Sequence, residues 1–347
     1  MAAVTTALER LRKASVVSLI GLGLLALVGL WLIVNFFKDP AEFINIGLIG
    51  LTNGTIYGLV ALGYTLIYGI LQLINFAHGD VFALSGLVAW SLIVNVLGLD
   101  KGTSVAGVIG GMILTLVVIM VLFAIVNAGI EFVAYRRLRR APRLAALITA
   151  VGMSFIVQNV SLAFYGVNFH SVPSFIPRTE AIGIGDVTYS WNKLSALLIT
   201  IPVLILLSWF VRSTKQGKAM RAVAQDTEAS AMMGINVNRT ISVTFLIAGA
   251  LAAVAGLVFL LEYNIRYDTG FELGLIAFTA AVLGGIGNLA GAVVGALVIG
   301  FVQSFNEGLT WHAPGGDWTR SIVFGILIAV LVFRPQGILG EQTPEGA

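Results

Sequence analysis

Residues 104–132 read SVAGVIGGMILTLVVIMVLFAIVNAGIEF, with no charged side chain before Glu131. A helix of about 20 consecutive apolar residues is long enough to cross the hydrocarbon core of a bilayer, which is roughly 30 Å thick. This stretch therefore predicts a transmembrane helix.

Apolar runs of this kind recur along the chain and predict an all-α, polytopic membrane protein. The runs at 44–74 and 272–306 are rich in glycine, so the number of helices they form is ambiguous. We predict about eight to ten transmembrane helices, some of them broken or re-entrant. The predicted spans are residues 15–37, 44–74, 81–98, 104–132, 144–166, 193–211, 241–262, 272–286, 289–306 and 320–334.

The composition supports lipid as the solvent. Only 11% of the 347 residues are charged and 58% are hydrophobic, whereas soluble domains carry about 25% charged residues. The chain has no cysteine, which excludes disulfides, thiolate nucleophiles and cysteine-based metal sites. The net charge of +3 is modest and the basic residues are clustered, so we predict no nucleic-acid partner.

The basic clusters predict the orientation, because Lys and Arg favour cytoplasmic loops. With ten spans, both termini lie in the cytoplasm and every basic cluster falls on that side. The clusters are Arg10 to Lys13, Arg136 to Arg143, Arg212 to Arg221, and Arg334.

We divide the chain into three parts. Residues 1–43 hold a cytoplasmic N-terminus and an N-terminal transmembrane helix, residues 44–340 form one membrane domain, and residues 341–347 form a polar tail. The apolar core of the first helix is about 22 residues long, which exceeds the usual 7–15 of a signal peptide. We therefore interpret it as a retained span.

A polar, partly charged segment, residues 217–234, lies between two long apolar spans. It has helical periodicity, and Gly234 ends it as a C-terminal cap would. One interpretation is an amphipathic helix on the membrane surface. The other is contact with a cytoplasmic protein, which the small side chains at 229–231 favour because they are poor lipid anchors. The residues assigned to this contact are Arg221, Glu228, Ala229, Ser230 and Gly234.

Residues 75–80, Asn-Phe-Ala-His-Gly-Asp, interrupt the apolar pattern with polar groups. Such groups are costly at membrane depth unless they are paired or line a wet cavity. In one interpretation they form a cytoplasmic turn in which Asp80 or Asn75 caps a helix. In the other, Asn75 and His78 shape a path or gate across the membrane.

Glycines at four-residue spacing predict close helix contacts. Gly54 and Gly58 form one such pair, and Asn53 and Tyr57 beside them either pack with them or face a substrate path. A second set predicts one helix face that meets another helix of this chain or of a second subunit. That set is Gly287, Gly291 and Gly295.

Motifs for catalysis are absent from the sequence. There is no phosphate-binding G-x-x-x-x-G-K-[ST] motif, no H-E-x-x-H and no G-x-S-x-G. A lone histidine in residues 75–80 is weak evidence for a metal site. We predict no catalytic residues, no metal and no cofactor. Few acidic residues fall within the spans, which argues against an ion-coupled transporter.

Several segments in combination resemble the LivH-type permeases of ATP-binding-cassette importers for branched-chain amino acids. The resemblance covers roughly residues 44–340. The segments are Asn53-Gly-Thr-Ile-Tyr57, Ala61-Leu-Gly-Tyr-Thr-Leu-Ile-Tyr-Gly69, Ile74-Asn-Phe-Ala-His-Gly79, Glu131 with Tyr135-Arg136 and Leu138-Arg139, Ala219-Met-Arg-Ala222 with Gln225-Asp226, Met233-Gly-Ile-Asn236, Ala277 to Gly287, and Arg334-Pro-Gln-Gly337.

The resemblance implies a permease of the bacterial inner membrane that takes up branched-chain or other neutral amino acids. It implies a LivM-like second permease, two cytoplasmic ATPases and an extracytoplasmic solute-binding protein. Glu228-Ala-Ser followed by Gly234 is similar to the loop by which such permeases engage their ATPases. The alternatives are a related permease for urea, a sugar or another small polar solute, and an ion-coupled secondary transporter. In this family resemblance, Phe76 favours amino acids over urea.

Overall fold

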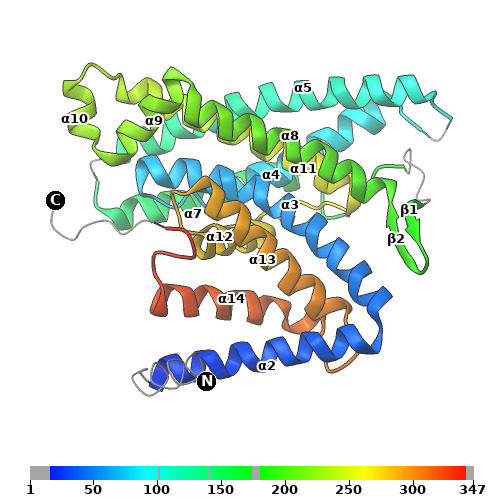
Figure 1. Cartoon of the computed structure of the whole chain (residues 1–347). Helices are drawn as coiled ribbons and strands as arrows, with labels where there is room; N and C mark the ends of the chain where they lie inside the picture. Colours follow the sequence, from blue (N-terminus) through cyan, green and yellow to red (C-terminus); the bar gives the residue numbers. More distant parts are fainter. Residues whose placement is uncertain (1–15, 101, 140, 174–179, 341–347) are drawn as a thin grey trace.

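The structure is a computed structural model that describes residues 16–100, 102–139, 141–173 and 180–340 (Figure 1). The α-helices are α2 (Val16–Lys38), α3 (Pro40–Leu71), α4 (Ala77–Ser91), α5 (Val105–Ile130), α6 (Arg136–Leu138), α7 (Arg143–Tyr165), α8 (Trp191–Ser213), α9 (Lys215–Gln225), α10 (Thr227–Met232), α11 (Val237–Glu262), α12 (Thr269–Gly284), α13 (Leu289–Gly308) and α14 (Gly316–Phe333). Two π-helical segments, η1 (Leu92–Val96) and η2 (Glu131–Tyr135), extend α4 and α5.

Eight helical stretches are long and apolar enough to cross a membrane. They are α3, α4 with η1, α5 with η2 and α6, α7, α8, α11, α13 and α14. Two shorter apolar helical stretches, α12 and Ala26–Lys38 within α2, accompany them. The prediction of an all-α polytopic membrane protein is therefore confirmed.

Polar side chains fix where several helices begin. Ser104 accepts a hydrogen bond from the backbone N–H of Gly107 (3.2 Å) at the start of α5, and Asp39 accepts one from Glu42 (2.9 Å) at the start of α3. Pro40 at the first position of α3 adds a preset φ. These are preferred N-cap residue types, so local sequence sets where α3 and α5 begin.

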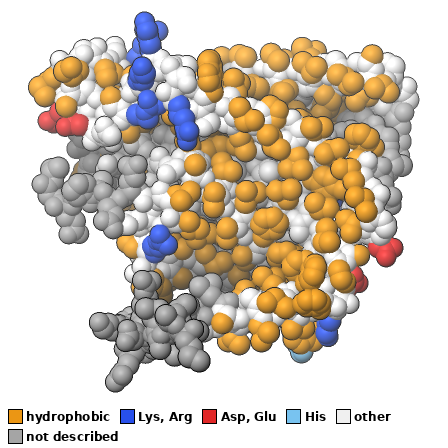
Figure 2. All heavy atoms as spheres, in the orientation of Figure 1, with side chains coloured by type: hydrophobic (Ala, Val, Ile, Leu, Met, Phe, Trp, Pro, Cys, Tyr) orange, Lys and Arg blue, Asp and Glu red, His pale blue; other side chains and the backbone are white. Residues whose placement is uncertain are grey.

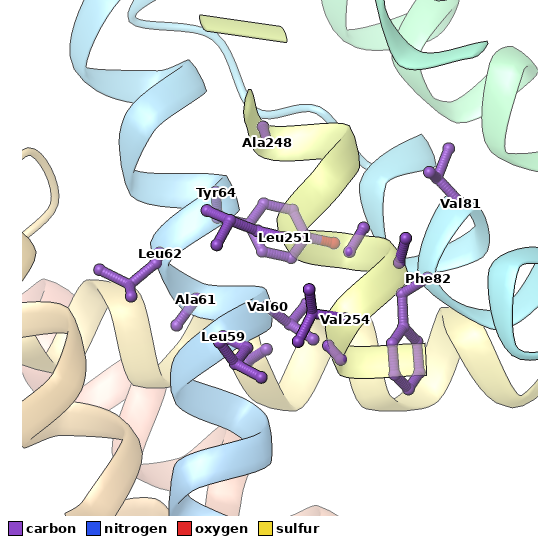
Figure 3. Packing of buried hydrophobic residues seen from close by; sticks show 14 of the residues in the cluster. Leu59, Val60, Ala61, Leu62, Tyr64, Val81, Phe82, Ala248, Leu251 and Val254 are labelled. Carbon is purple, nitrogen blue, oxygen red and sulfur yellow. The ribbon is translucent and has the colours of Figure 1, made fainter. Parts of the chain in front are cut away.

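The core lies where α3, α4 and α11 meet (Figure 3). Leu59 of α3 and Phe82 of α4 are completely buried, as is Val254 of α11. Helices α5, α7 and α8 surround this core. On α5, the exposed apolar side chains recur every four residues and so form one face toward lipid: Ile109, Ile113, Val117, Val121 and Ile125.

The surface separates into an apolar belt and charged ends. Figure 2 shows apolar side chains across the middle of the face and most Lys and Arg side chains near one end. Helices α9 and α10 lie at that end, together with the last described residues. At the opposite end lies an antiparallel hairpin of β1 (Glu180–Ile184) and β2 (Val187–Ser190). This distribution matches a chain that crosses a bilayer with its basic loops on one side.

Helix α2 is attached to the rest of the chain near its C-terminal end. The indole N–H of Trp31 donates to the backbone oxygen of Trp311 (3.0 Å), and the Asn35 amide also reaches that oxygen (3.4 Å). The ammonium group of Lys38 lies 4.7 Å from the centroid of the Trp311 ring. The predicted boundary between residues 43 and 44 falls inside α3, and the predicted tail, 341–347, lies outside the described residues.

The two Gly-rich regions, 44–74 and 272–306, differ in how many helices they form. Residues 44–71 belong to one uninterrupted helix, α3. The region 272–306 divides into α12 and α13, joined by the turn 285–288. Helix α12 has 16 residues, a length of about 24 Å, which is less than the roughly 30 Å of a bilayer core. Because α12 is too short to cross the bilayer alone, we expect residues next to it in the chain to lie in the membrane as well. Such an arrangement corresponds to the predicted re-entrant elements.

The predicted face of three glycines is wrong at one position. Gly287 lies in the turn before α13 with φ +96°, so it does not share a helix face with the other two. A Cβ atom on Gly291 would lie 2.3 Å from the Gly284 oxygen, and one on Gly295 would lie 2.1 Å from the Ala280 oxygen. Gly291 and Gly295 therefore let the backbones of α12 and α13 touch.

The tightest contact involving the first glycine pair joins α3 to α13. A Cβ on Gly54 would lie 2.8 Å from the Cα of Leu297, and one on Gly300 would lie 2.4 Å from the Gly54 nitrogen. Gly58 is less restricted, because its Cβ would lie 3.7 Å from the Ala296 side chain. Small residues let helices approach closely in lipid, where the hydrophobic effect does not drive them together.

We predict that Gly300→Ala destabilises the protein by about 1–3 kcal/mol, because the backbone of α3 leaves no room for a methyl group. Gly325→Ala in α14 is the matched control, since a Cβ there has no atom within 4 Å. Thermal unfolding in detergent should show a lower midpoint for the first variant only. Equal midpoints for both variants would mean that α3 and α13 are not closely packed.

Candidate functional site

Two helix-to-helix turns come together at a small pocket. The turn 72–76 joins α3 to α4, and the turn 285–288 joins α12 to α13. A Cβ on Gly69 would lie 3.7 Å from the Cα of Gly287, so the ends of these helix pairs are adjacent. Residues from both turns line the pocket, together with aromatic side chains: Tyr64, Tyr68, Leu73, Asn75, Phe278 and Ile286.

Asn75 is the polar side chain that this pocket takes from the turn 72–76. It is 1% exposed, and its amide oxygen accepts a hydrogen bond from the hydroxyl of Tyr135 (2.7 Å). The amide nitrogen has no partner among the described residues. An unpaired buried donor costs free energy, so this group is available to a hydrogen-bond acceptor in the pocket.

His78 lies one helical turn further on and is fully buried. Its ring meets the Tyr64 ring edge-on at 4.9 Å between centroids. A Cβ on Gly63 would lie 2.1 Å from the His78 Nε2 atom. In this conformation His78 therefore fills the space between α3 and α4 and does not face open volume.

The predicted capping role of residues 75–80 is wrong, since α4 begins without a side-chain cap. The Asp80 carboxylate instead accepts hydrogen bonds from Ser154 and from the Gln158 amide (3.0 Å), both on α7. It is 1% exposed. Near the N-terminus of α4 the helix dipole also favours a negative charge. Asp80 thus holds α7 to α4, and its position within a span was missed because the sequence pattern suggested a cytoplasmic turn.

Asn53 and Tyr57 form a separate polar group between α3, α13 and the end of α11. Tyr263 donates to the Asn53 side-chain oxygen (2.5 Å), and Tyr57 donates to Gln303 (2.6 Å). About 19 residues of chain, mostly helical, separate Asn53 from the turn 72–76, which corresponds to roughly 28 Å. The predicted path residues therefore form two groups and not one site.

The polar segment 217–234 contains two helices, so the predicted single helix is wrong. Asp226 has an extended backbone, and its carboxylate accepts hydrogen bonds from the N–H groups of Glu228 and Ala229 (both 2.9 Å). This is an N-cap, which ends α9 and starts α10. Gly234 follows α10 with φ +82°, a conformation that favours glycine.

The exposed side chains of this segment define a surface. Met232 and Met233 are 82% and 83% exposed beside Glu228, which is also exposed. Ser230 faces inward at 5% exposure, and Arg221 donates to the backbone oxygen of Val211. Arg221 and Ser230 therefore hold the segment to the protein, while the methionines and Glu228 are free for contact. We call Glu228, Met232 and Met233 the α10 surface.

Sequence reasoning also missed the role of a buried ionic cluster at the end of α5. Glu131 is fully buried and accepts hydrogen bonds from Arg136 (2.9 Å), Arg139 and Ser242 (2.9 Å). Arg139 also donates to Asn238 (2.6 Å). The spacing of one acid and two arginines was visible, but Asn238 and Ser242 come from α11 and could not be inferred.

The described residues contain no group of three or more His, Cys, Asp or Glu side chains that could hold a metal ion. The polar groups above are hydrogen-bonded to one another across helices.

Comparisons with known proteins agree on one family. Residues 46–332 match the family model described as the permease component of the branched-chain amino acid transport system. The chain is 36% identical to the high-affinity branched-chain amino acid transport system permease protein BraD of Pseudomonas aeruginosa, over 85% of this chain and 95% of that protein. It is 35% identical to LivH of Escherichia coli, with the same coverage.

More distant matches are weaker. A probable branched-chain amino acid transport permease protein LivH of Methanocaldococcus jannaschii is 27% identical over 81% of this chain and 88% of that protein. The solved structure of PsaBC from Streptococcus pneumoniae in complex with Fab aligns with 87% of this chain and 95% of its own. Its TM-score of 0.44 and identity of 14% add nothing to the argument.

The packing of His78 predicts a size-compensation experiment. Gly63→Ala should destabilise the protein by about 1–3 kcal/mol, because the new methyl group overlaps the imidazole ring. Combining it with His78→Ala makes room, so the double variant should unfold at a higher temperature than Gly63→Ala alone. If Gly63→Ala is as stable as the wild type, then the His78 ring does not pack against Gly63.

Proposed function

The chain belongs to the family of permease components of branched-chain amino acid transport systems, and we propose that it forms part of the translocation path of an ATP-driven importer for these or other neutral amino acids. Its role is transport and not catalysis. The observation that carries the proposal is 35–36% identity over 85% of the chain to BraD and LivH.

We further propose that the chain works with three kinds of partner. A second, LivM-like permease completes the path, two cytoplasmic ATPases supply energy, and an extracytoplasmic protein delivers the solute. The sequence has no phosphate-binding motif of its own, so in this proposal ATP is bound by the partner subunits. Exposed methionines on a polar segment are typical of adaptable protein contacts.

The ATPases are proposed to bind the α10 surface. Their movement on ATP binding displaces α10, and the spans then alternate between two arrangements that open the path to one side or the other. Asn75 and the pocket beside it are proposed as the inner part of that path, with Asn53 and Tyr57 in its outer part. His78 is proposed to support this gate by its packing between α3 and α4.

The protein is proposed to lie in the bacterial inner membrane with both termini in the cytoplasm. Basic residues gather at the end that holds α9 and α10 (Figure 2), and positive charge favours the cytoplasmic side. The hairpin β1–β2 would then face outward, where a solute-binding protein docks.

The function is tested with the chain and its three partners in proteoliposomes that contain ATP. Leucine, isoleucine and valine should enter, and each should compete with the others, while urea and sugars should not. The ATPases should also co-purify with the chain from membranes. Uptake that persists without ATP but requires an ion gradient would contradict the proposal.

Two variants test whether the ATPases bind at the α10 surface. Gly234→Val places a β-branched residue at φ +82°, at a cost on the order of 1–2 kcal/mol. Glu228→Arg reverses a charge on the same surface. Both variants should show weaker ATPase co-purification and slower uptake at normal membrane levels.

Gly234→Asn is the control for the first variant, because asparagine tolerates left-handed backbone, and it should behave like the wild type. Wild-type uptake in Gly234→Val and Glu228→Arg would show that the ATPases bind elsewhere.

The proposed orientation predicts which sites react with a reagent that cannot cross the membrane. The chain has no cysteine, so a single one can be introduced at exposed positions at either end. Asp186→Cys in the hairpin should be labelled from outside intact cells, and Lys218→Cys in α9 should be labelled only after the membrane is opened. The reverse pattern would invert the topology.

A further inference from the structure

Tyr135 lies between the ionic cluster around Glu131 and the pocket beside Asn75, which we call the inner pocket. It is 1% exposed and occupies the last position of the π-helix η2. Its hydroxyl donates to the Asn75 amide oxygen (2.7 Å), and its ring packs on that of Phe245 in α11 at 5.7 Å between centroids. One side chain thus connects the end of α5, helix α11 and the turn 72–76.

The first position of η2 is fixed to the start of α11. Glu131 accepts a hydrogen bond from Ser242 (2.9 Å), and Arg139 joins Glu131 to Asn238 (2.6 Å). Single π-helical turns within α-helices are rare and occur frequently at functional sites. Here the π-helical turn carries the ionic cluster at one end and the tyrosine at the other.

Helices α5 and α11 also pack directly against each other, backbone to backbone. A Cβ on Gly249 would lie 2.2 Å from the Phe123 backbone oxygen. The Asn127 amide donates to the backbone oxygen of Phe245 (2.7 Å). A displacement of the first turns of α11 is therefore carried to η2 and to Tyr135.

The first turn of α11 is joined directly to the proposed ATPase contact. Residues 233–236 are the whole connection between α10 and α11. The Ile235 N–H donates to the Ser230 oxygen (3.0 Å), and the Asn236 side chain caps α11 through the N–H of Arg239 (3.0 Å). A short, hydrogen-bonded connection transmits movement better than a flexible loop would.

We propose that Tyr135 is a positioning residue for the gate, which sets the Asn75 amide according to the position of α10 and α11. With the hydrogen bond formed, Tyr135 holds the amide oxygen and leaves the amide nitrogen toward the pocket. That nitrogen is a donor for a carboxylate or carbonyl oxygen of a passing solute. When α11 moves, the bond breaks and the turn 72–76 is released. This inference rests on the proposed function.

The test removes one hydroxyl group. Tyr135→Phe keeps the ring in place and deletes the bond to Asn75, so the assembled transporter should still hydrolyse ATP. The ratio of leucine imported to ATP hydrolysed should fall about fivefold, the size expected for one net hydrogen bond. Ser161→Ala is the control: it also deletes a buried hydroxyl hydrogen bond, to the Val157 backbone oxygen (2.9 Å), but on α7 and away from the proposed connection. It should leave the ratio unchanged.

A second measurement needs no import. A cysteine in place of Leu73, which lines the pocket, reports opening of the turn by its rate of labelling in membranes. Tyr135→Phe and Glu131→Gln should each raise that rate several-fold. The double variant should not exceed the faster single variant, because both changes act on one connection.

The outcomes separate the two proposals. Absence of import by the wild-type complex overturns the proposed function, while the labelling result still decides the role of Tyr135. An unchanged import ratio in Tyr135→Phe overturns that role. That role is also overturned if the effects of Tyr135→Phe and Glu131→Gln on the labelling rate add in the double variant.

Discussion

Direct contact between helix backbones is the constraint on which the rest of this structure depends. Lipid tails are as apolar as leucine, so the hydrophobic effect gives little drive for one span to bind another. Several pairs of helices instead approach through glycine, among them α3 with α13, α12 with α13, α4 with α12, α4 with α11, and α5 with α11. Dispersion then acts between backbones, and the side chains around them fill the remaining space. The turns 72–76 and 285–288 at the pocket are adjacent because the helices that they connect pack directly against one another.

Polar side chains within the spans form a second set of contacts between helices. Asp80 connects α4 to α7 through Ser154 and Gln158, and Glu131 connects η2 to α11. Each buried carboxylate is satisfied by several donors, as burial of a charge requires. An importer must change shape without unfolding.

The sequence predicted the features that depend on one segment at a time. Apolar run length located the spans, basic clusters indicated one end, and the left-handed position of Gly234 followed from its place after a helix. It failed where a local turn or cap interrupts a periodic pattern, and where contacts come from distant segments. Helical periodicity continued through residue 226, but the Asp226 side chain caps the backbone and divides the helix there. The spacing of Gly287 matched Gly291 and Gly295, yet the turn before α13 removes it from their face. Nothing local indicated that Tyr135 would meet Asn75, 60 residues earlier.

The attachment of α2 has a consequence for the synthesis of the protein. Trp31 bonds to the loop at Trp311, 280 residues later in the chain. Ribosomes add about 5–20 residues per second, so the first helix spends roughly 15–60 seconds in the membrane before its partner exists. During that time it must be stable as a lone helix in lipid. Its exposed apolar side chains lie on several faces, including Val28, Leu30 and Phe36, and meet that requirement. In the completed fold, Trp31, Asn35 and Lys38 near the end of α2 contact Trp311 and fix the helix in place.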